Sequence, residues 1–115
     1  MKSQSPGMTL RRGEIWWVQL DPTLGAEITK TRPCVVVGTN VLNDHRRTVV
    51  VIPLSTAPQP APPVLVPVVS GGRRVVAVMD QIRAVTKERF ISRVGELSSS
   101  DLTSVEDALR LVLEL

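Results

Sequence analysis

The chain has 115 residues, 43% of them apolar and 22% charged, so it is long enough for one folded domain with a modest core. A single cysteine and a single histidine exclude an intramolecular disulfide, a cysteine-based zinc site and any site that needs two histidines of one chain. No apolar run approaches the roughly 20 residues that cross a bilayer, and residues 1–10 lack the apolar segment of a signal peptide. We therefore expect a cytoplasmic protein.

Charge is distributed unevenly along the chain, although the formal net charge is only +3. Residues 1–97 carry 13 Lys and Arg against 7 Asp and Glu, whereas residues 98–115 carry one Arg against four acidic residues. The body is thus basic, at +6, which suits a polyanionic partner such as nucleic acid or an acidic protein. Solubility alone is an equally simple explanation of this charge.

The apolar residues favour strands, because 19 Val and 5 Ile stand against only three aromatic residues. We expect residues 1–10 to be a flexible extension and residues 11–115 to be a single domain. A long polar loop is predicted over residues 23–33, a turn with a brief helical piece over 40–47, and a stiff connector with four prolines over 55–63. Strands are predicted, in chain order, over residues 13–20, 34–39, 48–53, 64–69, 74–79, 82–85 and 91–97.

The last eighteen residues change to a helical period. Ser98 followed by Asp101 resembles a capping box, and Glu106 with Arg110 predicts an i,i+4 ion pair. An apolar stripe recurs at three- and four-residue spacing, at Leu102, Val105, Ala108, Leu109 and Val112. We expect this stripe to pack on the β-rich body, which gives a small, mainly antiparallel barrel or twisted sheet closed by a C-terminal α-helix.

Few residues suggest chemistry by themselves. Arg32 stands in the long loop before Pro33, where its guanidinium could bind phosphate oxygens or simply pair with Glu27 at the surface. Ser55 and Thr56 end a predicted strand, where a hydroxyl could donate to a phosphate or merely terminate the strand.

Further side chains are interpreted from the pattern. Gln81 and Arg83 share one face if residues 80–83 are extended, and would then line a binding surface or lie as plain surface groups. Of the adjacent Trp16 and Trp17, one is expected in the core and one exposed. Cys34 is expected to be a buried small hydrophobe. His45 and the pairs Arg46–Arg47 and Arg73–Arg74 are expected to be solvated.

Several short motifs taken together resemble a known family. They are residues 13–18 (GEIWWV), 21–27 (DPTLGAE), 32–37 (RPCVVV), 53–56 (PLST) and 80–83 (DQIR). Their order and separations, from about residue 12 to residue 115, are similar to the MazF/PemK toxin endoribonucleases of type II toxin–antitoxin systems. The resemblance implies an SH3-like barrel of about six or seven short strands with a C-terminal helix, a homodimer and a cognate antitoxin with an acidic segment.

The resemblance also implies an activity and a site. The activity is metal-independent, sequence-specific cleavage of single-stranded RNA such as mRNA, in which the 2′-OH attacks to leave a 2′,3′-cyclic phosphate and a 5′-OH, with no cofactor. By position, Arg32 matches the essential arginine, Ser55 the usual threonine, and Glu27 a glutamate that is functional in some members. Contacts to RNA are expected from Lys30, Thr56, Gln81 and Arg83.

Two other functions are compatible with the same fold. One is a non-catalytic, gyrase-inhibiting toxin of the CcdB kind, and the other is a basic RNA-binding module. Arg32 together with Ser55 favours the nuclease, because a gyrase inhibitor has no need of that pair. RNA cleavage in the presence of EDTA distinguishes the three.

Overall fold

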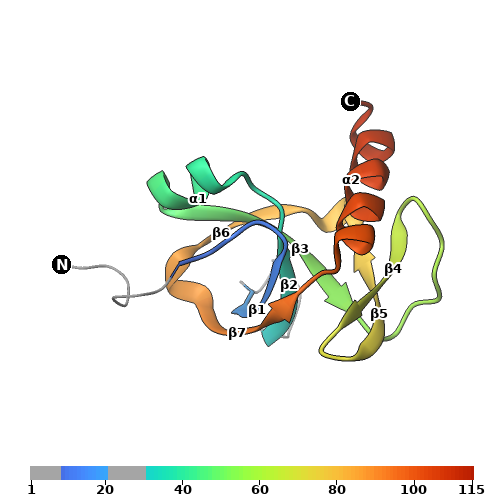
Figure 1. The fold of residues 1–115 in the computed structure, drawn as a ribbon, viewed down its shortest axis with the longest axis horizontal. Helices are drawn as coiled ribbons and strands as arrows, with labels where there is room; N and C mark the ends of the chain where they lie inside the picture. Colours follow the sequence, from blue (N-terminus) through green and yellow to red (C-terminus); the bar gives the residue numbers. More distant parts are fainter. Residues whose placement is uncertain (1–8, 21–30) are drawn as a thin grey trace, which may run out of the picture.

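The protein is a curled, half-barrel β-sheet with a C-terminal helix packed against one end (Figure 1); the computed structural model describes residues 9–20 and 31–115. The seven strands pair antiparallel throughout, in the order β4-β5-β3-β2-β1-β7, and β6 also pairs with β3. The predicted fold class is therefore confirmed. The strands are β1 (Glu14–Gln19), β2 (Thr31–Val36), β3 (Thr48–Ser55), β4 (Leu65–Ser70), β5 (Arg73–Val78), β6 (Arg83–Thr86) and β7 (Phe90–Glu96). The helices are α1 (Asn40–His45), α2 (Ser99–Leu113) and two 3-10 turns, η1 (Met79–Gln81) and η2 (Lys87–Arg89).

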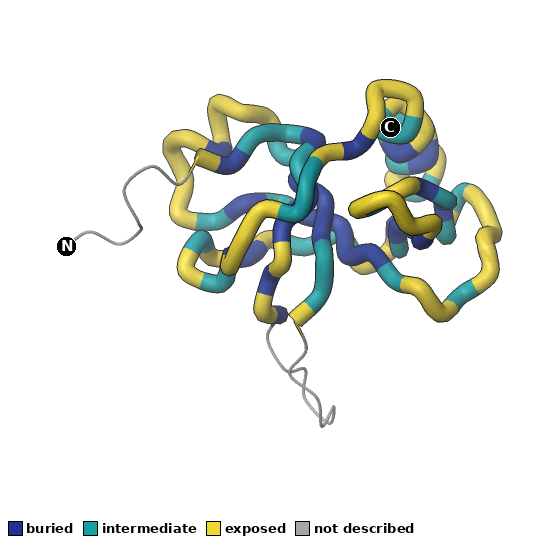
Figure 2. Tube along the Cα trace, turned by 60° about the horizontal axis from the view of Figure 1, so that its bottom comes forward, coloured by how far each residue is buried: buried dark blue, intermediate teal, exposed yellow. Residues whose placement is uncertain are grey.

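The central strands are buried on both faces, as their continuous apolar runs indicate (Figure 2). Along β2, Val35 belongs to a core cluster that lies against α2, while Cys34 and Val36 belong to a second cluster on the other face. The second cluster contains Trp16 and Phe90, whose rings meet edge to face with centroids 6.2 Å apart. Two cores therefore hold the sheet from both sides.

Strand β1 is covered on both faces, because Ile15 is buried in the first core cluster and Trp16 in the second. The β1–β7 ladder has a register shift between these two residues, which is the mark of a β-bulge. The extra residue, Val94, is on β7, so side chains along β1 still alternate between the two faces, and Trp17 is 41% exposed. The prediction of one buried and one exposed tryptophan is confirmed.

Helix α2 begins as predicted, since the Ser98 hydroxyl accepts a hydrogen bond from Asp101 N at 3.1 Å. The predicted capping box is wrong in its second hydrogen bond, in which the Asp101 side chain would accept from the backbone N–H of Ser98. The Asp101 carboxylate instead accepts from Val69 N, at 3.0 Å, and so connects the helix to β4. The apolar stripe packs on the first core cluster, with Val105 and Ala108 buried.

The predicted Glu106–Arg110 pair is also wrong. Glu106 is bound instead by Arg12, at 2.6 Å, which joins α2 to the start of β1. Arg110 pairs with Asp107 one turn earlier, at 2.9 Å. A tertiary partner has displaced the local one, because Arg12 reaches Glu106 while its Nε also donates to the Val37 carbonyl at 3.0 Å.

Other differences from the predicted elements concern boundaries. The loop expected over residues 23–33 ends earlier, because Thr31 already begins β2; residues 21–30 lie outside the described part of the chain. Of the expected N-terminal extension the structure describes Thr9 and Leu10, and Leu10 is buried in the second core cluster. The edge position of the strand that contains Pro67 is confirmed, since β4 ends the sheet order. Neither α-helix in the described part of the chain has the length and hydropathy needed to cross a bilayer.

Candidate active site

A fork between β2 and β3 opens one of the cavities of the described structure. The two strands pair only from Cys34 opposite Pro53 to Val36 opposite Val51, and beyond Pro53 the end of β3 pairs with β5 instead. Pro33 stands on β2 at the fork and has no N–H; by alternation from Val37, whose N–H donates to the Val50 carbonyl, the missing donor is one that would face β3. The sequence therefore parts the strands at this point.

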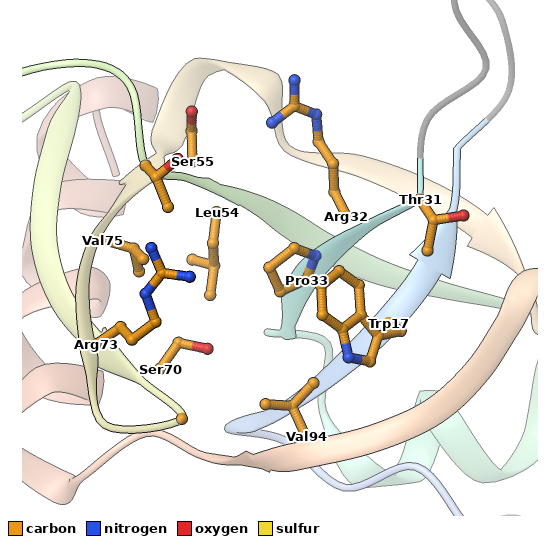
Figure 3. Close-up of a pocket in the computed structure, with 12 residues that line it drawn as sticks. Trp17, Thr31, Arg32, Pro33, Leu54, Ser55, Ser70, Arg73, Val75 and Val94 are labelled. Carbon is orange, nitrogen blue, oxygen red and sulfur yellow. The ribbon is translucent and has the colours of Figure 1, made fainter.

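The fork places Arg32 and Ser55 on opposite sides of one cavity. Continuing the register of the β2–β3 pair would set these two residues opposite each other. In the structure both line a cavity of about 450 Å³, together with Thr31, Thr56 and the apolar side chains at the fork. The close-up shows the Arg32 guanidinium and the Ser55 hydroxyl at the mouth of this cavity, from β2 and β3 respectively (Figure 3). We call it the Arg32 cavity.

A second guanidinium enters the Arg32 cavity from the β4–β5 hairpin. Gly71 and Gly72 both have positive φ, of 59° and 81°, a conformation that only glycine adopts without strain, and they form a tight turn between paired strands. Arg73 follows the turn as the first residue of β5, opposite Ser70, and both line the cavity. Figure 3 shows the Arg73 side chain reaching from the turn toward the middle of the cavity.

Neither arginine is neutralised by a neighbour within the described residues. Arg32 and Arg73 have no hydrogen bond or ion pair to any side chain of residues 9–20 or 31–115, whereas Arg11, Arg12, Arg93 and Arg110 each contact a carboxylate. Arg32 is half-buried and Arg73 is exposed. Two guanidiniums directed at one cavity create a positive site suited to an anion such as phosphate.

The Ser55 hydroxyl can donate to a ligand. Its oxygen accepts one long hydrogen bond, from Ala57 N at 3.4 Å, and its proton has no acceptor among the described residues. Ser55 is half-buried, whereas Thr56 beside it is exposed at the cavity edge. A donor held at a strand end, opposite a guanidinium, is the arrangement that stabilises charge on phosphate oxygens.

The opposite wall of the Arg32 cavity is apolar. Trp17 on β1 and Val94 on β7 line it, with Pro33 between them and the arginines (Figure 3). An exposed indole ring beside a cationic pocket offers a flat surface to a nucleobase. The scarcity of aromatic residues predicts that few RNA bases are stacked on side chains. One of the three aromatic residues, Trp17, lies beside the arginines of the cavity.

Cys34, which follows Pro33 on β2, is a free and buried cysteine. It is fully buried, and burial raises the pKa of its thiol to about 12, although the charges of Arg83 and Arg32 act in the opposite direction. The prediction that Cys34 is a buried small hydrophobe is confirmed. Arg83 also lies on the Cys34 side of the sheet, because it stands opposite Val51, which belongs to the same core cluster as Cys34.

The predicted site residues are only partly gathered together. Arg32, Ser55 and Thr56 line the Arg32 cavity; Gln81 and Arg83 do not. Their predicted alternation on one extended segment is wrong, because Gln81 ends the 3-10 turn η1 and β6 begins only at Arg83. Glu27 and Lys30 lie outside the described residues.

The sequence alone missed Arg73, Ser70 and Trp17 as parts of the site. The alternation of β5 was the available signal for Arg73, since it sets this residue on the same face as the buried Val75, which also lines the cavity. His45 is solvated as predicted, with its Nδ1 2.8 Å from the Val41 carbonyl. Across residues 9–20 and 31–115, no three His, Cys, Asp or Glu side chains come together as a metal site requires.

Comparison with known proteins gives one consistent result. Residues 11–113 match the family model of the PemK-like, MazF-like toxins of type II toxin–antitoxin systems. The chain is 35% identical to endoribonuclease MazF9 of Mycobacterium tuberculosis, over 92% of this chain and 98% of that protein. It is 26% identical to endoribonuclease EndoA of Bacillus subtilis, over 94% of this chain and 97% of that protein. In fold it resembles MazF from Deinococcus radiodurans, with a TM-score of 0.80 and 20% identity over 94% of this chain and 99% of that one.

The family match covers nearly the whole chain, and the relatives are matched over nearly their whole length. The expected family, inferred from the motif order, is thus confirmed. This chain belongs to the PemK-like, MazF-like toxins of type II toxin–antitoxin systems.

Proposed function

We propose that this chain is a metal-independent endoribonuclease that cleaves single-stranded RNA at the Arg32 cavity. The observation that carries the proposal is the meeting of Arg32, Ser55 and Arg73 around one cavity, with no carboxylate of the described residues to neutralise them. The names of its relatives, endoribonuclease MazF9 and endoribonuclease EndoA, support the same reaction class. The net +6 of residues 1–97 suits a polyanionic substrate.

In the proposed reaction the ribose 2′-oxygen bonds to the adjacent phosphorus and the bond from phosphorus to the 5′-oxygen breaks. A base takes the 2′-OH proton, and the departing 5′-oxygen receives a proton. The products are a 2′,3′-cyclic phosphate and a 5′-OH. Negative charge grows on the non-bridging oxygens as the bond forms, and charge-assisted hydrogen bonds from positioned donors stabilise it.

Each residue then has a specific role. Arg32 acts chiefly by electrostatic stabilisation, because a guanidinium keeps its proton in water and is a poor proton shuttle. Ser55 donates a hydrogen bond to a phosphate oxygen, and Thr56 contacts RNA beside it. Glu27 is the proposed base or positioning residue, and Lys30, Gln81 and Arg83 are proposed to contact nucleotides on either side of the cleaved bond.

The biological setting follows from family membership. We propose that the protein acts in the cytoplasm as a homodimer and that a cognate antitoxin with an acidic segment inhibits it. Support comes from an endoribonuclease of a Mycobacterial species that was solved in complex with its cognate antitoxin, to which this chain has a TM-score of 0.76 at 22% identity, over 91% of this chain and 95% of that one. An acidic segment would compete with RNA for the same unneutralised arginines.

The test is cleavage of a long, mixed-sequence RNA in the presence of EDTA, followed by sequencing of the 5′-OH ends. We expect discrete cuts at a short recurring motif, with 5′ fragments that end in a 2′,3′-cyclic phosphate and 3′ fragments that begin with a 5′-OH. Binding of RNA without cleavage would favour the RNA-binding module instead. Gyrase inhibition without any effect on RNA would favour the CcdB-like alternative.

A further inference from the structure

A second cavity adjoins the Arg32 cavity on the far side of Ser55. It measures about 280 Å³ and shares the wall formed by Ser55, Thr56 and Val75. Its other walls are mainly prolines, from the connector between β3 and β4 and from β4 itself: Pro58, Pro60 and Pro67. We call it the proline cavity. A ligand seated in one cavity is therefore in contact with the rim of the other.

Alternation along β5 directs its two arginines, Arg73 and Arg74, to different cavities. Arg73 lines only the Arg32 cavity, and the next residue, Arg74, lines only the proline cavity. Successive residues of a strand project to opposite faces, so Arg74 shares its face with Val76, which pairs with Pro67 across the β4–β5 ladder. Arg74 is exposed and, like Arg73, has no ion-pair partner among the described residues.

The chemistry of the proline cavity matches one nucleotide. Its floor is rigid and apolar, because proline rings fix the backbone and present only carbon to a ligand, which suits the flat face of a base. Its single charged group is a guanidinium, which suits a phosphate. A preformed site of this kind also loses little conformational entropy on binding.

We infer that the proline cavity is a substrate subsite, which holds a nucleotide flanking the cleaved bond with its base against the prolines and its phosphate on Arg74. The inference rests on the proposed ribonuclease activity and extends it to the choice of sequence. RNA then passes over the shared wall of Ser55 and Thr56, with Arg32 and Arg73 on one side and Arg74 on the other. Rejection of bases that do not fit the proline walls contributes to the motif that is cut.

The test compares Arg74→Ala with the matched variant Arg47→Ala. Arg47 is also an exposed arginine without an ion-pair partner among the described residues, and it follows α1, at the other end of the molecule from β4 and β5 (Figure 1).

The substrate is an oligoribonucleotide that contains the motif found by end sequencing. For Arg74→Ala we expect kcat/KM to fall about tenfold, mainly through KM, because a charge-assisted contact is lost. The slope of log kcat/KM against log salt should become shallower by about 0.7, as for one lost phosphate contact on a single strand. Arg47→Ala should change neither quantity.

A second measurement identifies which nucleotide has its base in the proline cavity. Single abasic nucleotides are introduced at each position next to the cleaved bond. One of them should lower kcat/KM of the wild type several-fold, and the double variant Pro58→Ala, Pro60→Ala should reduce that penalty. Circular dichroism confirms that each variant is folded.

The outcomes separate the inference from the proposed function. A wild type that cleaves no RNA overturns both. A wild type that cleaves, with Arg74→Ala indistinguishable from Arg47→Ala, overturns the subsite alone. Arg74→Ala that leaves RNA kinetics unchanged but weakens binding of a synthetic Glu-rich peptide shows a peptide site instead, and also overturns the subsite.

Discussion

At the scale of single residues, two neighbouring hydroxyls, those of Ser55 and Thr56, are candidates for the donor that binds the reacting phosphate. Both line the Arg32 cavity, but Ser55 is half-buried on the strand whereas Thr56 is exposed after its end. A donor stabilises a developing charge only if it is held in place before the reaction. The geometry therefore favours Ser55.

The competing hydroxyls can be separated by single substitutions. Ser55→Ala should lower kcat for RNA cleavage about 100-fold, the usual loss for one preorganised donor. Ser55→Thr should keep most of the activity, because it retains the hydroxyl. Thr56→Ala is the comparison variant and should lower the single-turnover rate much less than Ser55→Ala, because Thr56 is proposed to contact RNA and not the reacting phosphate. If Thr56→Ala were the more damaging change, the hydroxyl would be assigned to the wrong residue.

Cys34 gives a second prediction at this scale. Because burial raises its pKa to about 12, the thiol stays protonated and shielded at pH 8. We expect iodoacetamide to leave the native protein unmodified over an hour and to alkylate one site after denaturation in guanidinium, as measured by intact mass. The neutral thiol favours the folded state below the unfolded pKa, and this contribution disappears as the pH rises toward 12. Rapid labelling of the native protein would contradict the burial of this side chain.

At the scale of elements, Glu14 joins β1 to β7. Its carboxylate accepts hydrogen bonds from Trp16 Nε1 at 3.0 Å, Arg11 N at 2.9 Å and Arg93 Nε at 2.9 Å. Burial acts to raise the pKa of Glu14, but these hydrogen bonds together outweigh it and lower the pKa below its usual value. The ionised carboxylate therefore stabilises the fold.

The pH dependence of this cluster has a definite sign. A depressed folded pKa stabilises the protein above the unfolded pKa, near 4.5, and the contribution is lost as the pH falls through the folded value. Glu14→Gln should therefore lower the free energy of unfolding by about 1–3 kcal/mol at pH 7 and by less at pH 3.5, in urea titrations. Glu88→Gln, at an exposed carboxylate, is the control. An equal loss at both pH values would show that the charge of Glu14 is unimportant.

Helix α2 is the other element with a clear energetic role. Val105 is fully buried in the core cluster that lies against β4 and η1, so Val105→Ala should cost about 2 kcal/mol of unfolding free energy. Thr103→Ala, on the exposed side of the same helix, should change it by less than about 0.5 kcal/mol. Chemical denaturation measures both. For the same reason, removal of residues 101–115 should unfold the protein, and a folded, soluble truncation would contradict the packing of α2.

The elements also show how far the sequence could be interpreted. Local patterns were sufficient for the buried strands, the glycine turn and the period of α2, because each depends on residues close together in the chain. They failed at residues 31–33, which were predicted to be loop because of Pro33. These residues are in fact the start of β2, paired with β1, and the donor that proline lacks faces the gap beside β3, where no strand pairs with them. They also failed at Arg73, because the cavity exists only after β3 leaves β2 to pair with β5. Long-range pairing, not local propensity, decided both cases.

At the scale of the whole molecule, the acidic C-terminal segment and the arginines proposed to bind RNA lie in different parts of the structure. Residues 98–115 carry the acidic excess, and α2 lies against β4 with Glu106 held by Arg12. Three arginines that have no ion pair among the described residues, Arg32, Arg73 and Arg74, lie elsewhere, around the Arg32 cavity and the proline cavity. RNA is thus expected to bind the sheet side of the molecule rather than the helix.

The central claim is that an arginine-and-hydroxyl site cleaves RNA without a metal ion. It is tested most directly by the single-turnover rate of RNA cleavage in EDTA for wild type, Arg32→Lys and Arg32→Ala, each checked for folding by circular dichroism. The account predicts cleavage by wild type, a loss of about 10³-fold in Arg32→Ala, and a smaller loss in Arg32→Lys, which keeps the charge but not the planar fork. Folded Arg32→Ala protein that cleaves RNA at the wild-type rate would contradict it.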